Sequence, residues 1–305
     1  MTTSINGISS SYSSMTFASI ATTSPATWST TDIQALVAAD VTSLKPATIS
    51  AWTSDQINAM TTSVVAALSA TQVQALTTSQ VNNLTTSAVG ALTSNQLNSL
   101  KSTQIKAMTT TQVNAISTST LSNLKGSQLA LLSTSQVASI STSNVASLTS
   151  SQVASLTTDQ IVSLIGDQLT AMGDKIAGFT GSQVAALETA DLNSLTTTQM
   201  DALTALQVKS LTTTQLQNIS TTNLQAITAG DLVSLTGKQV AAMTTAGVAA
   251  LTTSQVAALT KDEVSGLTTA QVRALSTSQL QALSTAALAA FTTSQIGGFD
   301  TAQVN

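Results

Sequence analysis

The chain has 305 residues, of which 42% are hydrophobic but only 7% charged and 2% aromatic, and its formal net charge is −4. It contains neither Cys nor His, which excludes thiol nucleophiles, disulfides, the usual zinc sites and the commonest general base. Its nine Lys and Arg residues are spread singly, so the basic run of a nucleic-acid-binding protein is missing and we expect no nucleic-acid partner.

Residues 1–27 are rich in Ser and Thr, include Pro25 and match the rest of the chain poorly. They carry no basic start and no long apolar run, so they do not resemble a Sec-type signal peptide. We interpret them as an atypical or flexible N-terminal segment, with an export signal of another kind as the alternative. No stretch of the sequence is long and apolar enough to predict a transmembrane segment.

From Trp28 onward a large apolar residue returns every eight residues, and a second apolar residue follows each of these by five. We call the repeating unit an octad. The first ladder, predicted to form the structural core, includes Trp28, Trp52, Leu100, Leu148, Phe179, Leu251, Phe291 and Phe299. The second ladder begins with Ile33, Val41 and Ile49, so each octad supplies two core anchors.

The three-residue step from the second ladder to the next first-ladder residue is a helical spacing, but eight residues overshoot two helical turns by about 80°. A helix must therefore end within every octad. Ser or Thr follows most first-ladder residues and Gln usually comes three residues later, as in Thr53 with Gln56 and Thr252 with Gln255, which is a capping box. Pro46 falls at a first helical position, where its missing N–H costs nothing.

These patterns predict an all-α solenoid of very short capped helices of about two turns, one per octad. The number of octads in one superhelical turn is not determined by the sequence, and two is the simplest arrangement. A β-solenoid is the alternative, but the apolar spacing alternates five and three instead of two. Disorder is disfavoured because the apolar residues stand at fixed positions.

The repeat loses one residue near the middle, where Met172 is followed by Phe179 after seven residues. Four glycines gather there: Gly166, Gly173, Gly178 and Gly181. We predict a register slip or hinge at 173–181 between an array at 28–172 and another at 182–305, and a neutral deletion is the alternative. The last octads show no polar terminal repeat, which indicates end-to-end association or a longer parent chain.

The sequence offers no catalytic, cofactor-binding or metal-binding constellation, and we expect neither an enzyme nor a cofactor. Acidic residues gather modestly around the slip, without the spacing of a calcium site, and we interpret them as a solvated face; they are Asp159, Asp167, Asp174, Glu188, Asp191 and Asp201. Glu263 stands at the capping Gln position, where a helix dipole favours a negative charge. Trp28 and Trp52 fit the core better than an aromatic binding platform.

The unit L-[ST]-[ST]-x-Q-[VIL]-x-[AS], repeated from Trp28 onward, resembles the octapeptide arrays of large bacterial secreted and cell-surface proteins, often labelled adhesin-like. The resemblance implies an extracellular or cell-surface location, reached here without a Sec-type signal, and it carries over no catalytic or binding residues.

Three functions are open at this point. The first is a structural one, a filament, surface-layer or spacer subunit that self-associates end to end or laterally. The second is a binding module whose groove takes a glycan, a surface or a protein, with the region from Gly166 to Asp201 as the candidate site. The third is ice binding by regularly spaced threonines, which capping already explains.

Overall fold

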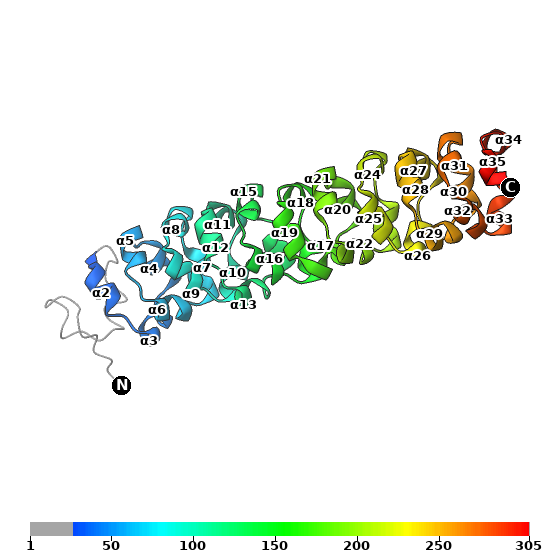
Figure 1. The fold of residues 1–305 in the computed structure, drawn as a ribbon. Coiled ribbons are helices and arrows are strands. Elements are labelled where there is room, and N and C mark those ends of the chain that lie inside the picture. The colour runs from blue at the N-terminus through cyan, green and yellow to red at the C-terminus, as the bar shows by residue number, and fades with distance from the viewer. Residues whose placement is uncertain (1–26, 305) are drawn as a thin grey trace. The chain divides into compact units, whose positions relative to one another are not determined.

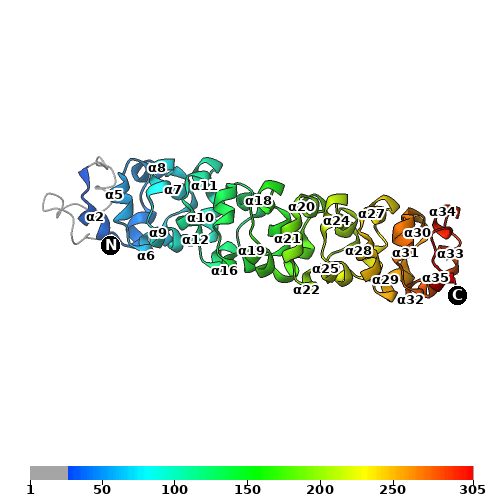
Figure 2. The same ribbon diagram turned by 45° about the horizontal axis from the view of Figure 1, so that its top comes forward.

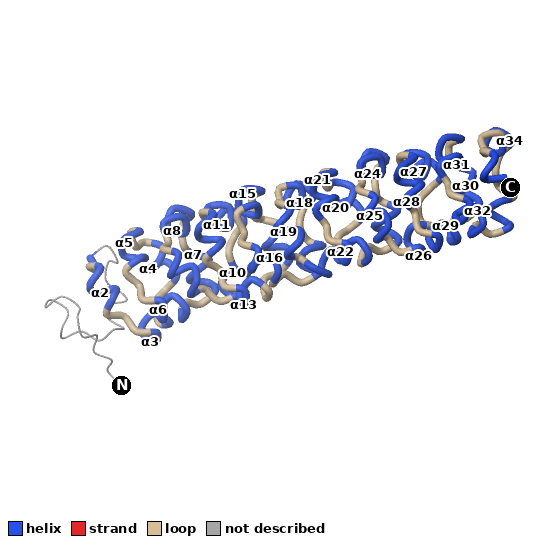
Figure 3. The backbone as a smooth tube through the Cα atoms, in the orientation of Figure 1, coloured by secondary structure: helices blue, strands red, loops and turns tan. Residues whose placement is uncertain are grey.

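The computed structural model describes residues 27–304, so the N-terminal segment lies outside the described residues apart from Thr27. All regular structure in the described range is helical, and short connections join the helices (Figure 3). The predicted all-α solenoid is therefore confirmed. The chain divides into two compact units, Met1–Leu148 and Thr149–Asn305.

Each octad forms one short helix. The helices of the first unit are α2 (Thr30–Gln34), α3 (Ala38–Thr42), α4 (Pro46–Ser50), α5 (Ser54–Asn58), α6 (Thr62–Ala67), α7 (Ala70–Ala75), α8 (Thr78–Asn83), α9 (Thr86–Ala91), α10 (Ser94–Ser99), α11 (Ser102–Ala107), α12 (Thr110–Asn114), α13 (Thr118–Leu121), α14 (Gly126–Leu129), α15 (Thr134–Ala138) and α16 (Thr142–Ala146).

The elements of the second unit are α17 (Ser150–Ala154), α18 (Thr158–Val162), α19 (Gly166–Ala171), the 3₁₀ helix η2 (Gly173–Gly178), α20 (Gly181–Ala186), α21 (Thr189–Ser194), α22 (Thr197–Asp201), α23 (Ala205–Lys209), α24 (Thr213–Asn218), α25 (Thr221–Ala226), α26 (Ala229–Leu232), α27 (Gly237–Ala242), α28 (Thr245–Ala250), α29 (Thr253–Ala258), α30 (Lys261–Gly266), α31 (Thr269–Ala274), α32 (Thr277–Ala282), α33 (Thr285–Leu288), α34 (Thr293–Ile296) and α35 (Thr301–Val304).

The helices are shorter than the predicted two turns, because two extended residues separate each helix from the next. After α7, Leu76 has φ −56° and ψ 139°, and Thr77 has φ −72° and ψ 161°. The first of these is the first-ladder residue and the second is the N-cap of the following helix. An octad therefore spends up to six residues on its helix and two on a turn of the chain.

Three octads complete one turn of the solenoid, which corrects the simplest expectation of two. In the first unit α4 contacts α7, α7 contacts α10, and α8 contacts α11. Figure 1 shows α4, α7 and α10 following one another, and Figure 2 shows the same relation for α24, α27 and α30 in the second unit. The sequence marks where the chain turns but not by how much, because the angle is set by the dihedrals of the two extended residues.

Both ladders point into the interior of the stack. Among the predicted core residues, Trp28, Trp52, Leu100, Leu148, Phe179, Leu251 and Phe291 are buried, and Phe299 is half-buried. The rings of Trp28 and Trp52 lie one turn apart with centroids 5.7 Å from each other, inside the core. Their burial is consistent with packing in the core and not with an aromatic binding platform made by these two residues.

The capping glutamines also join one turn to another. In the octad of α12, the Thr109 N–H donates to Gln112 Oε1 (2.7 Å), and Thr109 Oγ1 accepts from the Gln112 N–H (3.2 Å). The buried amide of Gln112 then donates through Nε2 to the carbonyl oxygens of Leu84 (2.7 Å) and Val81 (2.9 Å). The same pattern, with carbonyls 28 and 31 residues earlier, recurs at Gln96, Gln136, Gln215, Gln255 and Gln271.

Asparagines on the outer side supply a cap acceptor where the capping glutamine is missing. Asn58 Oδ1 accepts from the N–H of Thr85 (3.1 Å), whose octad has Ala88 in place of Gln. In the same way Asn114 Oδ1 accepts from the N–H of Ser141, whose octad carries Asn144, and Asn193 Oδ1 accepts from the N–H of Ser220, whose octad carries Asn223. Asn98 Oδ1 also accepts from the Lys125 N–H (2.8 Å), although that octad has Gln128. The missing acceptor is therefore replaced from another turn.

At the slip, seven residues fill one position of the stack. The helix η2 contacts α17 on one side and α22 on the other, as an octad helix would. Across this turn Gln183 still donates to Leu156 and Val153, now 27 and 30 residues earlier. The boundary between the two compact units lies at Leu148, so the slip falls inside the second unit.

The four glycines at the slip have two different reasons to be glycine. Gly173 has φ 56°, a left-handed conformation that other residues adopt only with strain. The other three lie where a neighbouring turn approaches closely: a Cβ on Gly178 would come within 2.5 Å of the Ser150 oxygen, and Gly166 and Gly181 similarly face Ser194 and Ser210. Close packing therefore accounts for these glycines, and hinge motion stays a prediction.

We predict that Gln112→Glu destabilises the protein by about 2 kcal/mol, because the carboxylate keeps the cap acceptor but cannot donate to the Leu84 and Val81 carbonyls. The control is Gln74→Glu, since Gln74 is exposed and donates only to the Ser99 oxygen. Urea unfolding at neutral pH measures both. Equal losses in the two variants would contradict the bridging role.

We also predict that Asn58→Ala costs about 1 kcal/mol more than Asn82→Ala. Both asparagines donate to a carbonyl of the next turn at 2.7 Å, from Asn58 to Asn83 and from Asn82 to Ala107. Only Asn58 also accepts from a cap N–H, because the corresponding Thr109 N–H already has Gln112. Denaturant midpoints compare the pair, and indistinguishable values would show that the replaced acceptor is unimportant.

Candidate functional site

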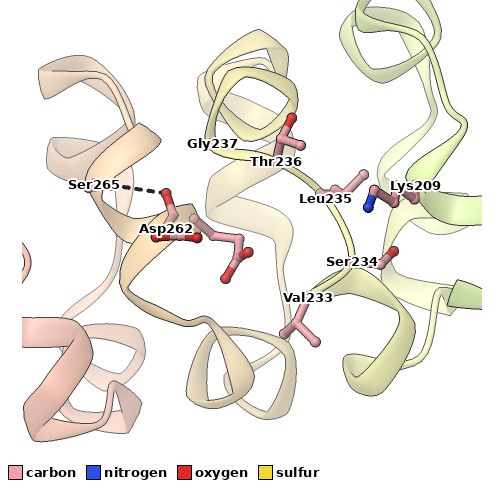
Figure 4. Close-up of a pocket in the computed structure, with 9 residues that line it drawn as sticks. Lys209, Val233, Ser234, Leu235, Thr236, Gly237, Asp262 and Ser265 are labelled. Atoms are coloured by element: carbon pink, nitrogen blue, oxygen red, sulfur yellow. Dashed lines mark hydrogen bonds between the residues drawn. The ribbon is translucent and has the colours of Figure 1, made fainter.

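The surface of the second unit contains a groove with a volume of about 550 Å³ between three successive turns. Lys209, at the end of α23, lies on one side, and Asp262 and Ser265 of α30 lie on the other, with the segment 233–237 between them (Figure 4). This segment ends α26, passes through the first-ladder residue Leu235 and begins α27. The groove is therefore built across turns and not within one octad.

The backbones of α27 and α30 approach each other unusually closely beside this groove. A Cβ on Gly266 would lie 2.3 Å from the Gly237 Cα, and a Cβ on Gly237 would lie 2.8 Å from the Asp262 oxygen. Glycine is required on both helices because no side chain fits between them. The pair fixes the spacing of the two elements that carry Thr236 and Asp262.

Glu263 lines the groove at the position normally held by the capping Gln. Its side chain is 3% exposed, and its Oε2 accepts from the Thr260 N–H (2.7 Å) and from the Thr260 hydroxyl (2.6 Å). A carboxylate has no amide N–H, so the inter-turn donation expected toward the carbonyl of Leu235 is absent from this octad. The groove floor is consequently rich in hydrogen-bond acceptors.

The charged residues at the rim of the groove supply both a hydrogen-bond donor and a hydrogen-bond acceptor. Lys209 is a donor, and Asp262 is an acceptor whose backbone oxygen also receives the Ser265 hydroxyl (3.1 Å). Ser234 is already engaged, because its hydroxyl lies within hydrogen-bond distance of two acceptors, the Ala205 oxygen (2.8 Å) and the Asp231 oxygen (2.6 Å). This arrangement offers a donor and several acceptors to a ligand with several hydroxyls.

The region from Gly166 to Asp201, predicted as the candidate binding region, is arranged differently. Asp159, Asp167 and Asp191 lie in the first turns of α18, α19 and α21, and Glu188 is the N-cap of α21. Asp201 lines a shallower hollow of about 400 Å³ with Thr197, Thr198, Gln225 and Ala226. In the part of the chain that the structure describes, no three acidic side chains converge as a metal site would require.

Asp191, in the first turn of α21, has a carboxyl whose pKa departs from its usual value. Partial burial, and secondarily the negative charge of Glu188, raise the pKa of Asp191 above its usual value. Asp191 stands where other octads have the bridging Gln. The shift reflects the position of a carboxyl in the stacking interface, which gives it a structural explanation.

Sequence reasoning placed the predicted capping residues on the stack but did not find the groove. Thr53 and Gln56 form the reciprocal pair, with the Thr53 N–H donating to Gln56 Oε1 at 2.7 Å, and Thr252 and Gln255 do the same at 2.9 Å. The groove joins residues from octads that are far apart in the chain. The sequence feature that could have indicated the groove is Glu263 at the position of a capping Gln, together with glycines at 237 and 266.

The fold defines the class of protein as an α-solenoid of octapeptide repeats, and a sequence comparison identifies the repeat. The chain matches the ALTTAQ repeat at residues 33–70, 58–86, 89–118, 184–221, 224–261 and 277–305, together more than half of its length. It belongs to the ALTTAQ repeat family. In the stretch ALTTSQ at 75–80, Leu76 is a core anchor, Thr77 is the N-cap and Gln80 bridges the turns.

No curated protein matches the chain. Among the described helices, none combines the length and the apolar character needed to cross a membrane.

Proposed function

We propose that this chain is a non-enzymatic structural protein, a spacer, filament or surface-layer subunit outside the cell or on its surface, which self-associates. The observation that carries the proposal is the repeated glutamine bridge, which joins turn to turn with neutral hydrogen bonds in both units. Stacking by such bonds builds length without a special site in each repeat.

The small share of charged residues, 7% of the chain, supports the same role. Within the described residues, Lys175 forms an ion pair with its neighbour Asp174 (3.5 Å); the Asp174 side chain is exposed and that of Lys175 is half-buried. Salt screens exposed charges but acts little on buried neutral hydrogen bonds. A protein held together in this way keeps its form over a wide range of ionic strength, which suits a structural element outside a cell.

The test is the concentration dependence of assembly. We expect negative-stain electron microscopy and sedimentation velocity to show particles that grow with protein concentration, and the same growth at low and high salt. The control is Gln112→Glu, which removes the hydrogen bonds from the Gln112 amide to the carbonyls of the preceding turn. Uniform monomers at every concentration would contradict self-association.

The groove beside Lys209 favours a second candidate function, an adhesin-type module that binds a glycan. Its acceptor-rich floor and its Lys209 and Asp262 rim match a ligand with several hydroxyls. We predict that Lys209→Ala combined with Asp262→Ala lowers binding to an immobilised glycan panel at least about tenfold, from the loss of charge-assisted hydrogen bonds. Lys106→Ala with Asp55→Ala is the control, and unchanged binding in the groove variant would exclude the role.

A further inference from the structure

The buried carboxylate of Glu263 has one oxygen atom without a hydrogen bond. Its Oε2 accepts from the N–H and the hydroxyl of Thr260, but within the described residues no donor reaches Oε1. In regular octads an amide nitrogen occupies this place, as in Gln271, whose Nε2 donates to the Met243 carbonyl (2.7 Å). Glu263 is 3% exposed, so water solvates its charge poorly, and a buried negative charge without a partner is destabilising.

The carbonyl group that an amide at this position would reach also lacks a donor. Leu235 lines the groove and stands 28 residues before Glu263, which is the separation at which Gln271 meets Met243. Its carbonyl oxygen accepts no hydrogen bond from the part of the chain that the structure describes. Asp262 adds a second carboxylate at the rim. Glu263 Oε1, the Leu235 oxygen and the Asp262 carboxylate therefore give the groove three acceptors and a surplus of negative charge.

Lys209 lies on the opposite side of the groove, beyond the segment 233–237 (Figure 4). Its side-chain amine forms no ion pair or hydrogen bond with the described residues. The two carboxylates of the lining outnumber this single amine, so the groove favours a ligand that brings positive charge. An ammonium group carries one positive charge and three N–H donors, which match the three acceptors opposite Lys209.

We propose that the groove binds the free ammonium group of an amino sugar in a glycan. The inference rests on the second candidate function proposed above and names its ligand class. The ammonium donates to Glu263 Oε1, the Leu235 carbonyl and Asp262, and so replaces the amide donor that this octad lacks. The Lys209 amine donates to hydroxyl oxygens of the sugar. A glycan is favoured over a lysine side chain because most lining residues are polar, whereas the stem of a lysine packs on apolar surface.

The first experiment compares two ligands that differ in one chemical group. The glucosamine tetramer carries free ammonium groups at mildly acidic pH, and the N-acetylglucosamine tetramer has neutral amides in their place. Both are titrated into the full chain and followed by nuclear magnetic resonance, which detects weak binding. We expect the glucosamine tetramer to bind at least about tenfold more tightly, because only its nitrogen brings charge-assisted hydrogen bonds to the acceptors.

The variant that tests the site is Glu263→Gln. It restores the amide of a regular octad, so we expect it to fold and to reach a urea midpoint at or above that of the wild type. We expect it to bind the two tetramers equally, because its amide takes the place of the ammonium at the Leu235 carbonyl. The control is Asp55→Asn, which removes the same charge from an exposed residue of the first unit and keeps the preference for the glucosamine tetramer.

Two further ligands identify the source of the positive charge. Tri-lysine offers ammonium groups without a sugar, and calcium chloride at constant ionic strength offers a cation without N–H donors. We expect neither to displace the glucosamine tetramer. Displacement by tri-lysine would overturn the glycan as the ligand, and displacement by calcium would replace the ammonium with a metal ion.

The inference and the functions proposed above fail in different ways. If both tetramers bind equally and the double variant Lys209→Ala with Asp262→Ala loses both, ammonium recognition is overturned and the glycan-binding role stands. If neither tetramer binds, the inference is overturned, and self-association is unaffected because it does not use the groove.

Discussion

The structure depends on a buried side-chain amide that most octads carry at the same position. The Gln side chain at the third helical position accepts from the N–H of its own cap and donates to carbonyls of the turn below, so it satisfies backbone groups at a helix start and at a helix end together. Helices of four to six residues have few backbone hydrogen bonds of their own and are unstable alone. The amide supplies the missing partners while the two apolar ladders supply the buried surface.

Most of the irregular features of the structure lie at octads that lack this glutamine. Asparagines of another turn replace the cap acceptor at Thr85, Ser141 and Ser220. Glu263 keeps the cap and loses the bridge, and a groove lies beside it. Asp32 and Asp40 occupy the same position in the first described turn, where each accepts from the N–H of its own cap residue. The departures from the repeat therefore include a groove and caps completed from another turn.

The slip illustrates how much irregularity the stack tolerates. A seven-residue unit replaces an octad, and a 3₁₀ helix with Gly173 in a left-handed conformation takes the place of a capped α-helix. The bridges of Gln183 and Gln207 continue on either side, because each depends on carbonyl positions in the neighbouring turn and not on the number of residues between. Loss of one residue is absorbed locally, where three glycines allow neighbouring turns to approach.

The sequence by itself determined the helical class, the eight-residue period, the core anchors and the caps, because these are local properties. Apolar spacing, a Ser or Thr followed by Gln, and Pro46 at a first helical position all act within one octad. Tertiary structure decided that three octads make a turn, that Gln112 reaches Leu84, and that Lys209 and Asp262 border one groove. Each of these depends on the angle between successive helices, which the dihedrals of two extended residues set and the repeat sequence does not encode in readable form.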